Sequence, residues 1–126
     1  MNFSSTRLFA LLALIFVALP ANAAPKNKQG EKFYREKVAP ILAKNCFGCH
    51  GPKSKLRGEL FLGSRAGILR GGESGPAVNL KEPDSSRLLD AINYRTFEMP
   101  PKKKLPKGQI DILTKWVKMG IPIPKG

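Results

Sequence analysis

The sequence Cys46-Phe47-Gly48-Cys49-His50 guides the interpretation of the whole chain. Two thiols separated by two residues and followed at once by a histidine form the pattern of covalent haem attachment. The spacing suits the chemistry, because two thiolates add to the two vinyl groups on one edge of a haem and the adjacent imidazole can reach the iron. The chain has only two cysteines and one histidine, and all of them lie in this stretch. The motif therefore predicts a c-type haem site.

Three other interpretations of the cysteine pair are possible. Structural zinc usually takes four Cys or His ligands, and the chain has no second pair. A thioredoxin-like redox pair calls for a preceding strand and an α/β pattern, and neither is visible. A structural disulfide would have no need of the histidine. Haem attachment is favoured, and a non-haem protein that uses Cys46 and Cys49 for disulfide exchange stays as an alternative.

Residues 1–23 have the features of a cleaved secretory signal peptide. Arg7 supplies a positive charge, residues 8–19 are an unbroken apolar run, and the Ala-Asn-Ala sequence at 21–23 fits the small-x-small cleavage pattern. Twelve apolar residues would span about 18 Å as a helix, well short of the ~30 Å hydrocarbon core, so no stable membrane span is expected after cleavage. We therefore expect a periplasmic or otherwise exported protein, an environment that also suits c-type haem attachment.

The remaining chain is predicted to form one domain. Removal of the signal peptide from the 126-residue chain leaves 103 residues, of which 24–30 are polar and are expected to be a flexible leader. Residues 31–126 form the predicted domain. Cleavage removes one arginine and no acidic residue, so the net charge falls from +13 to +12. Two haem propionates would lower it by about two more, which leaves a strongly basic protein.

Helical periodicity and turn residues predict an all-α domain with no strand of useful length. A helix is expected over 31–45, with a kink or restart near 38–40 because Pro40 removes a hydrogen bond and clashes with the preceding turn. The turn of the cysteine motif should itself be helical. Residues 60–62 are too short to classify, although we expect them to lie against the haem edge.

Three more helices follow in the second half of the chain. The first is expected over 64–70, with Ser64 as N-cap and Gly71 just past its end. The second begins at a cap formed by Asp84 or Ser85, and the third covers about 106–119. The side chains expected to face inward from the last two helices are Leu88, Leu89, Ile92, Ile110, Leu113, Trp116 and Val117.

A second chemical feature is Met99, which lies in a predicted loop and is followed by two prolines. If His50 holds the iron on one side, no second histidine exists for the other axial position, which leaves Met, Lys, Tyr or an open site. Met1 leaves with the signal peptide, and Met119 lies at the end of the last helix. The two prolines limit the backbone freedom of Met99 and favour it as a ligand. The alternative is a methionine that fills a gap in the core.

Five stretches of the chain occur in the order found in a known family. They are VAPILAKNCFGCHG at 38–51, LRGGESGPAV at 69–78, SRLLDAI at 86–92, MPP at 99–101 and IDILTKWV at 110–117. On these stretches the chain resembles the planctomycete-type cytochrome c family, a branch of the class I-like c-type cytochromes. The resemblance extends over nearly all of residues 31–122. One departure is Gly63, where the family often has an acidic residue, so the local turn is expected to differ.

The resemblance implies a cofactor, a set of ligands and a fold. One haem c per chain would be attached through Cys46 and Cys49, with His50 as the proximal and Met99 as the distal ligand of the iron. The fold would be a small class I-like cytochrome c fold, with three to five helices packed around the covalently bound haem. The first and last helices would then cross near the haem edge.

The sequence also suggests two structural details. Phe33 and Trp116 are our candidates for the crossing of the first and last helices. A backbone carbonyl should accept the ring proton of His50, because such partners orient metal-binding histidines, and Gly75–Pro76 is our candidate for it.

The ligation implied by the resemblance predicts an electron carrier rather than an enzyme, since both axial positions of the iron are filled. The alternative is a haem-based sensor or small-ligand binder in which Met99 is displaceable. Lys102, Lys103 and Lys104 follow the proposed ligand and predict a redox partner that is acidic at its docking face. These lysines can equally be a solvated loop. Nucleic acid is not an expected partner, because the chain is exported and shows no nucleic-acid-binding motif.

Overall fold

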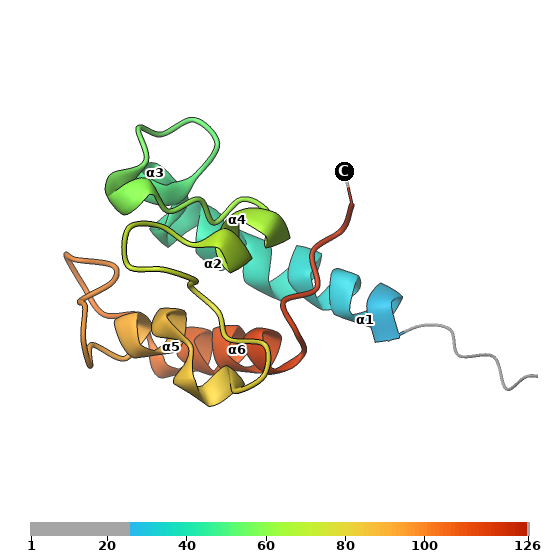
Figure 1. The fold of residues 1–126 in the computed structure, drawn as a ribbon. Helices are drawn as coiled ribbons and strands as arrows, with labels where there is room; N and C mark the ends of the chain where they lie inside the picture. Colours follow the sequence, from blue (N-terminus) through green and yellow to red (C-terminus); the bar gives the residue numbers. More distant parts are fainter. Residues whose placement is uncertain (1–25, 126) are drawn as a thin grey trace, which may run out of the picture.

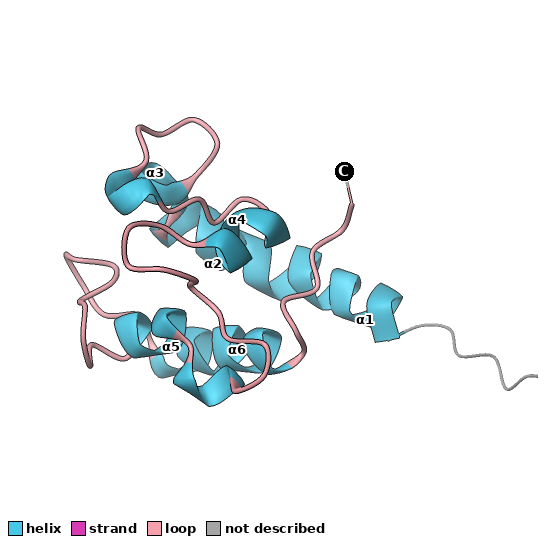
Figure 2. Ribbon diagram, viewed as in Figure 1, coloured by secondary structure: helices cyan, strands magenta, loops and turns pink. Residues whose placement is uncertain are grey.

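The computed structural model describes residues 26–125, and the predicted signal peptide lies outside this part of the chain. Over 26–125 the regular secondary structure is helical and no strand forms; Gly72 and Gly75 make one isolated bridge (Figure 2). The elements are α1 (Lys26–Phe33), the π-helical η1 (Tyr34–Val38), α2 (Ala39–Asn45), α3 (Phe47–His50), the 3₁₀ turn η2 (Arg57–Glu59), α4 (Arg65–Arg70), the 3₁₀ turn η3 (Pro83–Ser85), α5 (Arg87–Ile92) and α6 (Lys107–Lys118). The prediction of an all-α fold is confirmed.

The first helical stretch runs without a break through α1, η1 and α2. Its change of pitch lies just before Pro40, the second residue of α2. The backbone N–H of Ala39 donates to the carbonyl of Tyr34, five residues back, so the turn is wider than in an α-helix. A wider turn accommodates the proline ring, which would otherwise press on the carbonyl of Glu36. The change predicted near 38–40 therefore takes the form of a change of pitch, from π-helical to α-helical, in a continuous helix rather than a kink or a restart.

The start of α1 corrects the expectation of a flexible leader over 24–30 for residues 26–30; residues 24 and 25 lie outside the described part of the chain. Residues Lys26–Gly30 form the N-terminal part of α1, and Gly30 is buried. The cause is a contact with the C-terminal tail: a Cβ added to Gly30 would lie 2.7 Å from Cγ of Pro122. The tail folds back onto this helix and stabilises turns whose polar sequence does not predict order.

The crossing of the first and last helices is built on Tyr34 rather than on Phe33. α6 packs against η1, the segment that continues from α1 in Figure 1. The ring centroids of Tyr34 and Trp116 are 5.8 Å apart. Trp116 is fully buried, and its indole Nε1 donates to the Pro122 carbonyl at 3.1 Å. Phe33 is only partly buried, and Nζ of Lys115 lies 5.1 Å from its ring centroid. The prediction failed because Tyr34, four residues after the buried Gly30, occupies the inward face of the helix.

α4 forms as its capping residues predict. The side chain of Ser64 accepts a hydrogen bond from the N–H of Gly67 at 3.0 Å, which satisfies one of the free donors at the helix start. Gly71 follows the last helical residue with φ at +73°, a conformation that favours glycine.

α5 begins at a different residue from the one predicted. Asp84 and Ser85 lie in the 3₁₀ turn η3, and Ser86 is the N-cap. The hydroxyl of Ser86 is buried and accepts from the N–H of Asn79 at 3.0 Å, so it serves the preceding loop instead of the helix. The expected inward residues Leu88, Leu89 and Ile92 are buried.

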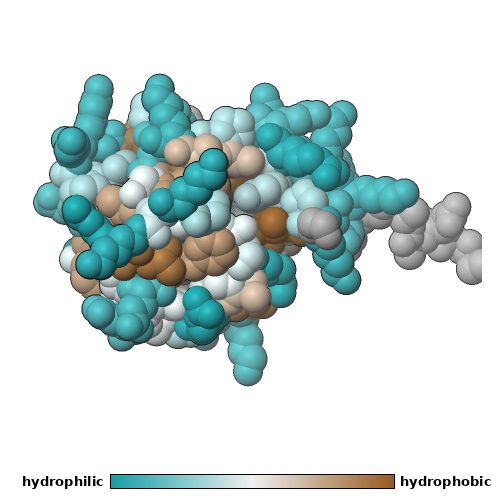
Figure 3. Space-filling model, turned by 90° about the horizontal axis from the view of Figure 1, so that it is seen from above, coloured by the Kyte–Doolittle hydropathy of each residue, from teal (hydrophilic) through white to brown (hydrophobic). Residues whose placement is uncertain are grey.

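One apolar core joins these elements. It combines side chains from the first helical stretch, α4, α5, α6 and the C-terminal tail, and its largest fully buried members are Trp116, Leu42, Ile68, Ile92, Leu113 and Ile121. Hydrophilic side chains cover much of the surface seen in Figure 3, with apolar side chains exposed between them. No helix within residues 26–125 is both long and apolar enough to cross a membrane.

Candidate functional site

α3 carries the cysteine motif at the end of the first helical stretch. The N–H of Cys46 still donates to the Leu42 carbonyl at 2.8 Å, so α2 leads directly into the motif. The N–H of His50 then donates to the Cys46 carbonyl at 2.9 Å, which closes one helical turn over the five residues. At the end of this turn the His50 carbonyl accepts from the N–H of Leu62 at 2.8 Å. The expectation of a helical motif is confirmed, and residues 60–62 are tied to it.

The His50 imidazole has a defined orientation. Its Nδ1 lies 3.2 Å from the carbonyl oxygen of Leu60. A carbonyl can only accept, so in the neutral imidazole the proton is on Nδ1 and Nε2 keeps a free lone pair. The expectation that Gly75–Pro76 would provide this carbonyl is wrong. Leu60 provides it because the 3₁₀ turn η2, with Gly58 at φ +59°, returns the chain to the motif.

The predicted site residues meet at one cavity of about 340 Å³. Cys46, Cys49, His50 and Met99 all line it. Most of the other lining side chains are apolar and include Leu60, Leu62, Ala77, Leu88, Ala91, Ile92, Phe97, Pro100 and Pro101. Two thiols, an imidazole nitrogen and a thioether on an apolar wall are the donor set and the surroundings that a c-type haem requires. The residues present therefore fit this cofactor.

Met99 reaches the cavity from the loop between α5 and α6. Its side chain is 37 % exposed, and its backbone N–H donates to the Ala91 carbonyl of α5 at 3.2 Å. α3 and this loop lie at the same end of the molecule, α3 above and the loop below in Figure 1. Thus His50 and Met99, 49 residues apart in the sequence, belong to different walls of the same cavity. Met119 does not line it.

Glycines form a thin wall on another side of the cavity. Gly72 lies so close to the turn η2 that a Cβ on it would be 2.0 Å from the Gly58 carbonyl oxygen. The N–H of Glu73 donates to that same oxygen at 2.9 Å, which fixes the two segments to each other. Both segments line the cavity. The close backbone approach explains why this glycine-rich loop tolerates no side chain at residue 72.

This contact leads to a first prediction. We expect Gly72→Ala to destabilise the protein by about 1–3 kcal/mol, because the Cβ meets backbone that cannot rotate away. Gly108→Ala is the matched control: Gly108 lies in α6 with nothing within 4 Å of its added Cβ. That substitution should stabilise by about 0.5–1 kcal/mol through helix propensity. Denaturant unfolding of the haem-loaded variants measures both, and equal stability of Gly72→Ala and the unchanged protein would contradict the prediction.

The environment of the cysteines argues against disulfide exchange. Burial, and next the nearby Cys49, raises the pKa of the Cys46 thiol to about 11. Thiols used for exchange have a lowered pKa, because the thiolate is the nucleophile. Zinc is also disfavoured: over residues 26–125, no group of three or more His, Cys, Asp or Glu side chains is arranged to hold a metal ion.

Two arginines of the cavity escaped the sequence analysis. Arg57 and Arg87 are the cationic side chains among the lining residues, and both are exposed. Arg87 approaches the glycine wall, with Nη2 3.9 Å from the Cβ position of Gly75. No sequence signal distinguished them from the other basic residues of a chain that contains 22 lysines and arginines.

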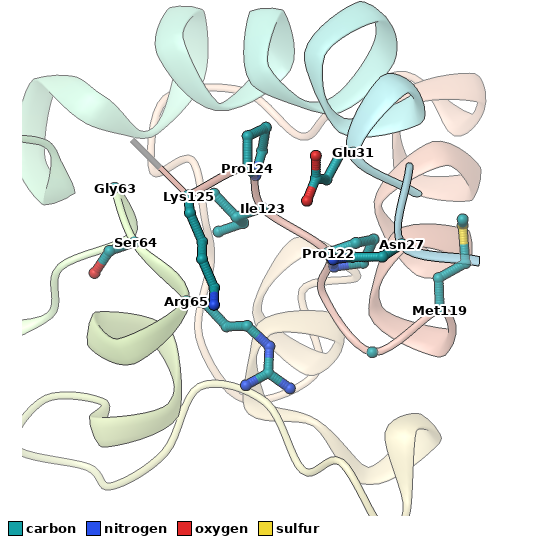
Figure 4. A pocket seen from close by; sticks show the side chains of 11 residues that line it. Asn27, Glu31, Gly63, Ser64, Arg65, Met119, Pro122, Ile123, Pro124 and Lys125 are labelled. Carbon is teal, nitrogen blue, oxygen red and sulfur yellow. The ribbon is translucent and has the colours of Figure 1, made fainter. Parts of the chain in front are cut away.

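A larger cavity of about 800 Å³ lies away from these residues, between the start of α1, the start of α4 and the C-terminal tail (Figure 4). Its polar lining side chains are those of Asn27, Glu31, Ser64, Arg65 and Lys125, and Met119 lies at one side. Neither a thiol nor an imidazole lines it. The smaller apolar cavity, which holds the residues with ligating chemistry, is therefore the candidate functional site.

An all-α domain that brings a Cys-x-x-Cys-His motif and a methionine to one apolar cavity has the organisation of a c-type cytochrome. Comparison with known families agrees, because the family model described as Planctomycete cytochrome C matches residues 46–103. The match covers both the cysteine motif and Met99, and it confirms the resemblance found in the sequence. A cytochrome c domain of this kind implies covalently bound haem. No curated protein and no solved structure matches the chain.

Proposed function

We propose that the protein is an exported c-type cytochrome that carries one electron through a single haem. Cys46 and Cys49 would attach the haem, and His50 and Met99 would be its axial ligands. The observation that carries the proposal is the presence of these four side chains around one apolar cavity. If these two side chains hold the iron, they would leave no open site for a substrate, so the proposed function is electron transfer rather than catalysis.

The haem supplies the one-electron chemistry when it is bound. The chain's own residues orient it and adjust its potential. The Leu60 carbonyl fixes the His50 tautomer that leaves Nε2 available to a metal. Apolar side chains such as Leu62 and Ile92 keep water from the cavity and disfavour the more highly charged ferric state. A methionine ligand acts in the same direction, because a thioether raises the potential.

The proposed partner is a redox protein with an acidic docking face, and we propose neither a nucleic-acid partner nor a stable membrane span. Lys102 and Lys103 are exposed close in sequence to Met99, which lines the cavity. Lys104 is also exposed, but its Nζ donates to the Asn93 carbonyl at 3.0 Å and so is directed back onto the loop. Exposed positive charge near the cavity would steer an acidic partner to it, and this attraction should weaken with salt.

A haem-based sensor or small-ligand binder is the second candidate. It is favoured by one observation, the 37 % exposure of Met99 in a loop that lies outside the helices. A thioether presented from such a loop can leave the iron more readily than one held by a helix. The two candidates differ in how firmly Met99 stays bound.

The deciding experiment is the absorption spectrum of the reduced protein, made with a haem-attachment system, before and after addition of carbon monoxide. We expect haem bands that carbon monoxide does not change, which would indicate a closed six-coordinate iron and an electron carrier. Bands that shift promptly would favour the sensor. If no haem bands appeared, both proposals would fail and the cysteine pair would have to be reconsidered as a thiol site.

A further inference from the structure

We propose that Tyr94 is a positioning residue for Met99 and that its hydroxyl helps to keep the methionine in the cavity. The inference rests on the proposed role of Met99 as a ligand. Tyr94 lies in the loop between α5 and α6, which we call the distal loop and define as residues 93–104. Neither the cysteine motif nor the family stretches quoted above include this tyrosine.

The backbone around Met99 is held on both sides. On one side, the N–H of Met99 donates to the Ala91 carbonyl at 3.2 Å. On the other side, the Tyr94 hydroxyl donates to the carbonyl of Pro100, the next residue. Ala91 and Tyr94 belong to the end of α5 and the turn after it, and Ala91 lines the cavity. The two hydrogen bonds therefore fix Met99 relative to the cavity wall itself.

The sequence after Met99 makes the tyrosine contact more important. Pro100 and Pro101 have no N–H, so neither can donate a backbone hydrogen bond to the rest of the domain. The Pro100 carbonyl, which accepts from Tyr94 in the turn after α5, therefore holds the backbone on the C-terminal side of Met99. The distal loop has little apolar burial of its own here, since Phe97 is 47 % exposed and Met99 37 %.

Tyr94 is itself held in an uncommon conformation. Its φ is +62°, in the left-handed region that a residue with a bulky side chain seldom adopts. The end of α5 requires this conformation. The N–H of Tyr94 donates to the Ala91 carbonyl at 3.1 Å, and the N–H of Arg95 donates to the Asp90 carbonyl at 2.9 Å. This pair of bonds closes a helix around a left-handed residue, so the cap fixes the position from which the Tyr94 side chain extends. Nζ of Lys104 lies 5.6 Å from the ring centroid of that side chain.

The contact has a measurable consequence for ligand binding. An external ligand such as carbon monoxide can bind only while Met99 is away from the iron, so its apparent affinity scales with the fraction of molecules in that state. Tyr94→Phe removes one hydrogen bond from the arrangement in which Met99 is bound to the iron. The fraction of molecules with Met99 away from the iron should then rise about two- to tenfold, because this is the factor that the free energy of one hydrogen bond corresponds to. The ring, and with it the Lys104 contact, is kept in Tyr94→Phe.

The experiment titrates the reduced, haem-loaded protein and its Tyr94→Phe variant with carbon monoxide up to high pressure, well above the single addition that leaves the bands unchanged, and compares their apparent affinities. Tyr34→Phe is the matched control, because Tyr34 is the only other tyrosine and packs against Trp116 rather than lining the cavity. We expect affinity to rise about two- to tenfold in Tyr94→Phe and to stay unchanged in Tyr34→Phe. Lys104→Ala should also raise the carbon monoxide affinity, but by a smaller factor. This variant provides the test if Tyr94→Phe does not fold.

The possible results separate this inference from the proposed function. If Met99→Ala raises carbon monoxide affinity but neither Tyr94→Phe nor Lys104→Ala does, then Met99 is a ligand and the positioning role is wrong. An equal rise in both tyrosine variants would indicate general loosening of the domain and would also overturn the inference. If Met99→Ala itself has no effect, the proposed ligation fails, and the positioning role fails with it.

Discussion

The Met99→Ala variant is expected to lose reduction potential and to gain affinity for external ligands. Met99 lines the same apolar cavity as His50, and alanine has no atom that can reach or bind a metal there. Because a methionine ligand raises the potential of a haem, we expect a fall on the order of 100 mV, a small part of the roughly 0.8 V range over which axial ligands act. For one electron this is about 2 kcal/mol.

The second part of the effect is the opening of the iron. Carbon monoxide, which should leave the spectrum of the reduced protein unchanged, should bind to Met99→Ala and shift its bands. Potentiometric titration and the carbon monoxide spectrum can be recorded on the same sample. Because the loss of the thioether causes both effects, a variant with a lower reduction potential should also bind carbon monoxide.

Met119→Ala is the control for both measurements. Met119 is exposed to nearly the same degree as Met99, at 39 % against 37 %, but it lines the larger cavity beside the C-terminal tail. Its substitution removes an identical side chain and should leave potential and spectrum unchanged. An unchanged potential in Met99→Ala would show that Met99 is not the ligand, and the same fall in both variants would show that the effect does not come from ligation.

Local features of this fold could be predicted from the sequence. Ser64 and Gly71 determine where α4 starts and ends, because a side-chain acceptor and a left-handed residue act within a single turn. Pro40 determines a change of pitch for the same reason, since its missing N–H and its ring affect only the preceding turn. Each of these predictions needed only residues within about four positions along the chain.

Features that depend on distant segments were missed. The choice of Tyr34 over Phe33 at the helix crossing, and the order of Lys26–Gly30, both depend on packing against α6 and the tail. No periodicity in the first helical stretch, residues 26–45, reveals that Pro122 will cover Gly30. Tertiary packing of this kind contributes more to helix stability than the helix propensity of the local sequence. A polar stretch whose sequence predicts a flexible leader can therefore form a helix.

The candidate site likewise has features that the local sequence predicts and features that depend on distant segments. The motif at 46–50 indicates its own chemistry, because two thiols and an imidazole are adjacent in the chain. The Leu60 carbonyl beside His50 was missed, since its position depends on a turn in which Gly58 and Glu59 both have positive φ. The contact of Tyr94 with Pro100 was missed as well, because sequence patterns do not predict a left-handed tyrosine. The ligation of iron by His50 and Met99 stays a prediction.

The largest effect on stability is expected from Trp116→Ala. Trp116 is fully buried in α6, its ring packs on Tyr34, and its Nε1 donates to the Pro122 carbonyl. Truncating a buried tryptophan to alanine costs about 3–5 kcal/mol, because the cavity left behind closes only in part. Small domains have total stabilities of about 5–15 kcal/mol, so this one change should remove a large share. Denaturant unfolding of the haem-loaded protein, followed by circular dichroism, measures it.

Trp116→Phe separates the two contributions of the side chain. Phenylalanine keeps an aromatic ring against Tyr34 but loses the donor to Pro122, so we expect a smaller loss, of which the hydrogen bond accounts for about 0.5–1.5 kcal/mol. Because the tail that Pro122 belongs to also covers Gly30, Trp116→Ala should release the start of α1, and amide exchange should accelerate there before it does in α4. Uniform acceleration, or a loss below about 1 kcal/mol, would mean that the helix crossing does not depend on this ring.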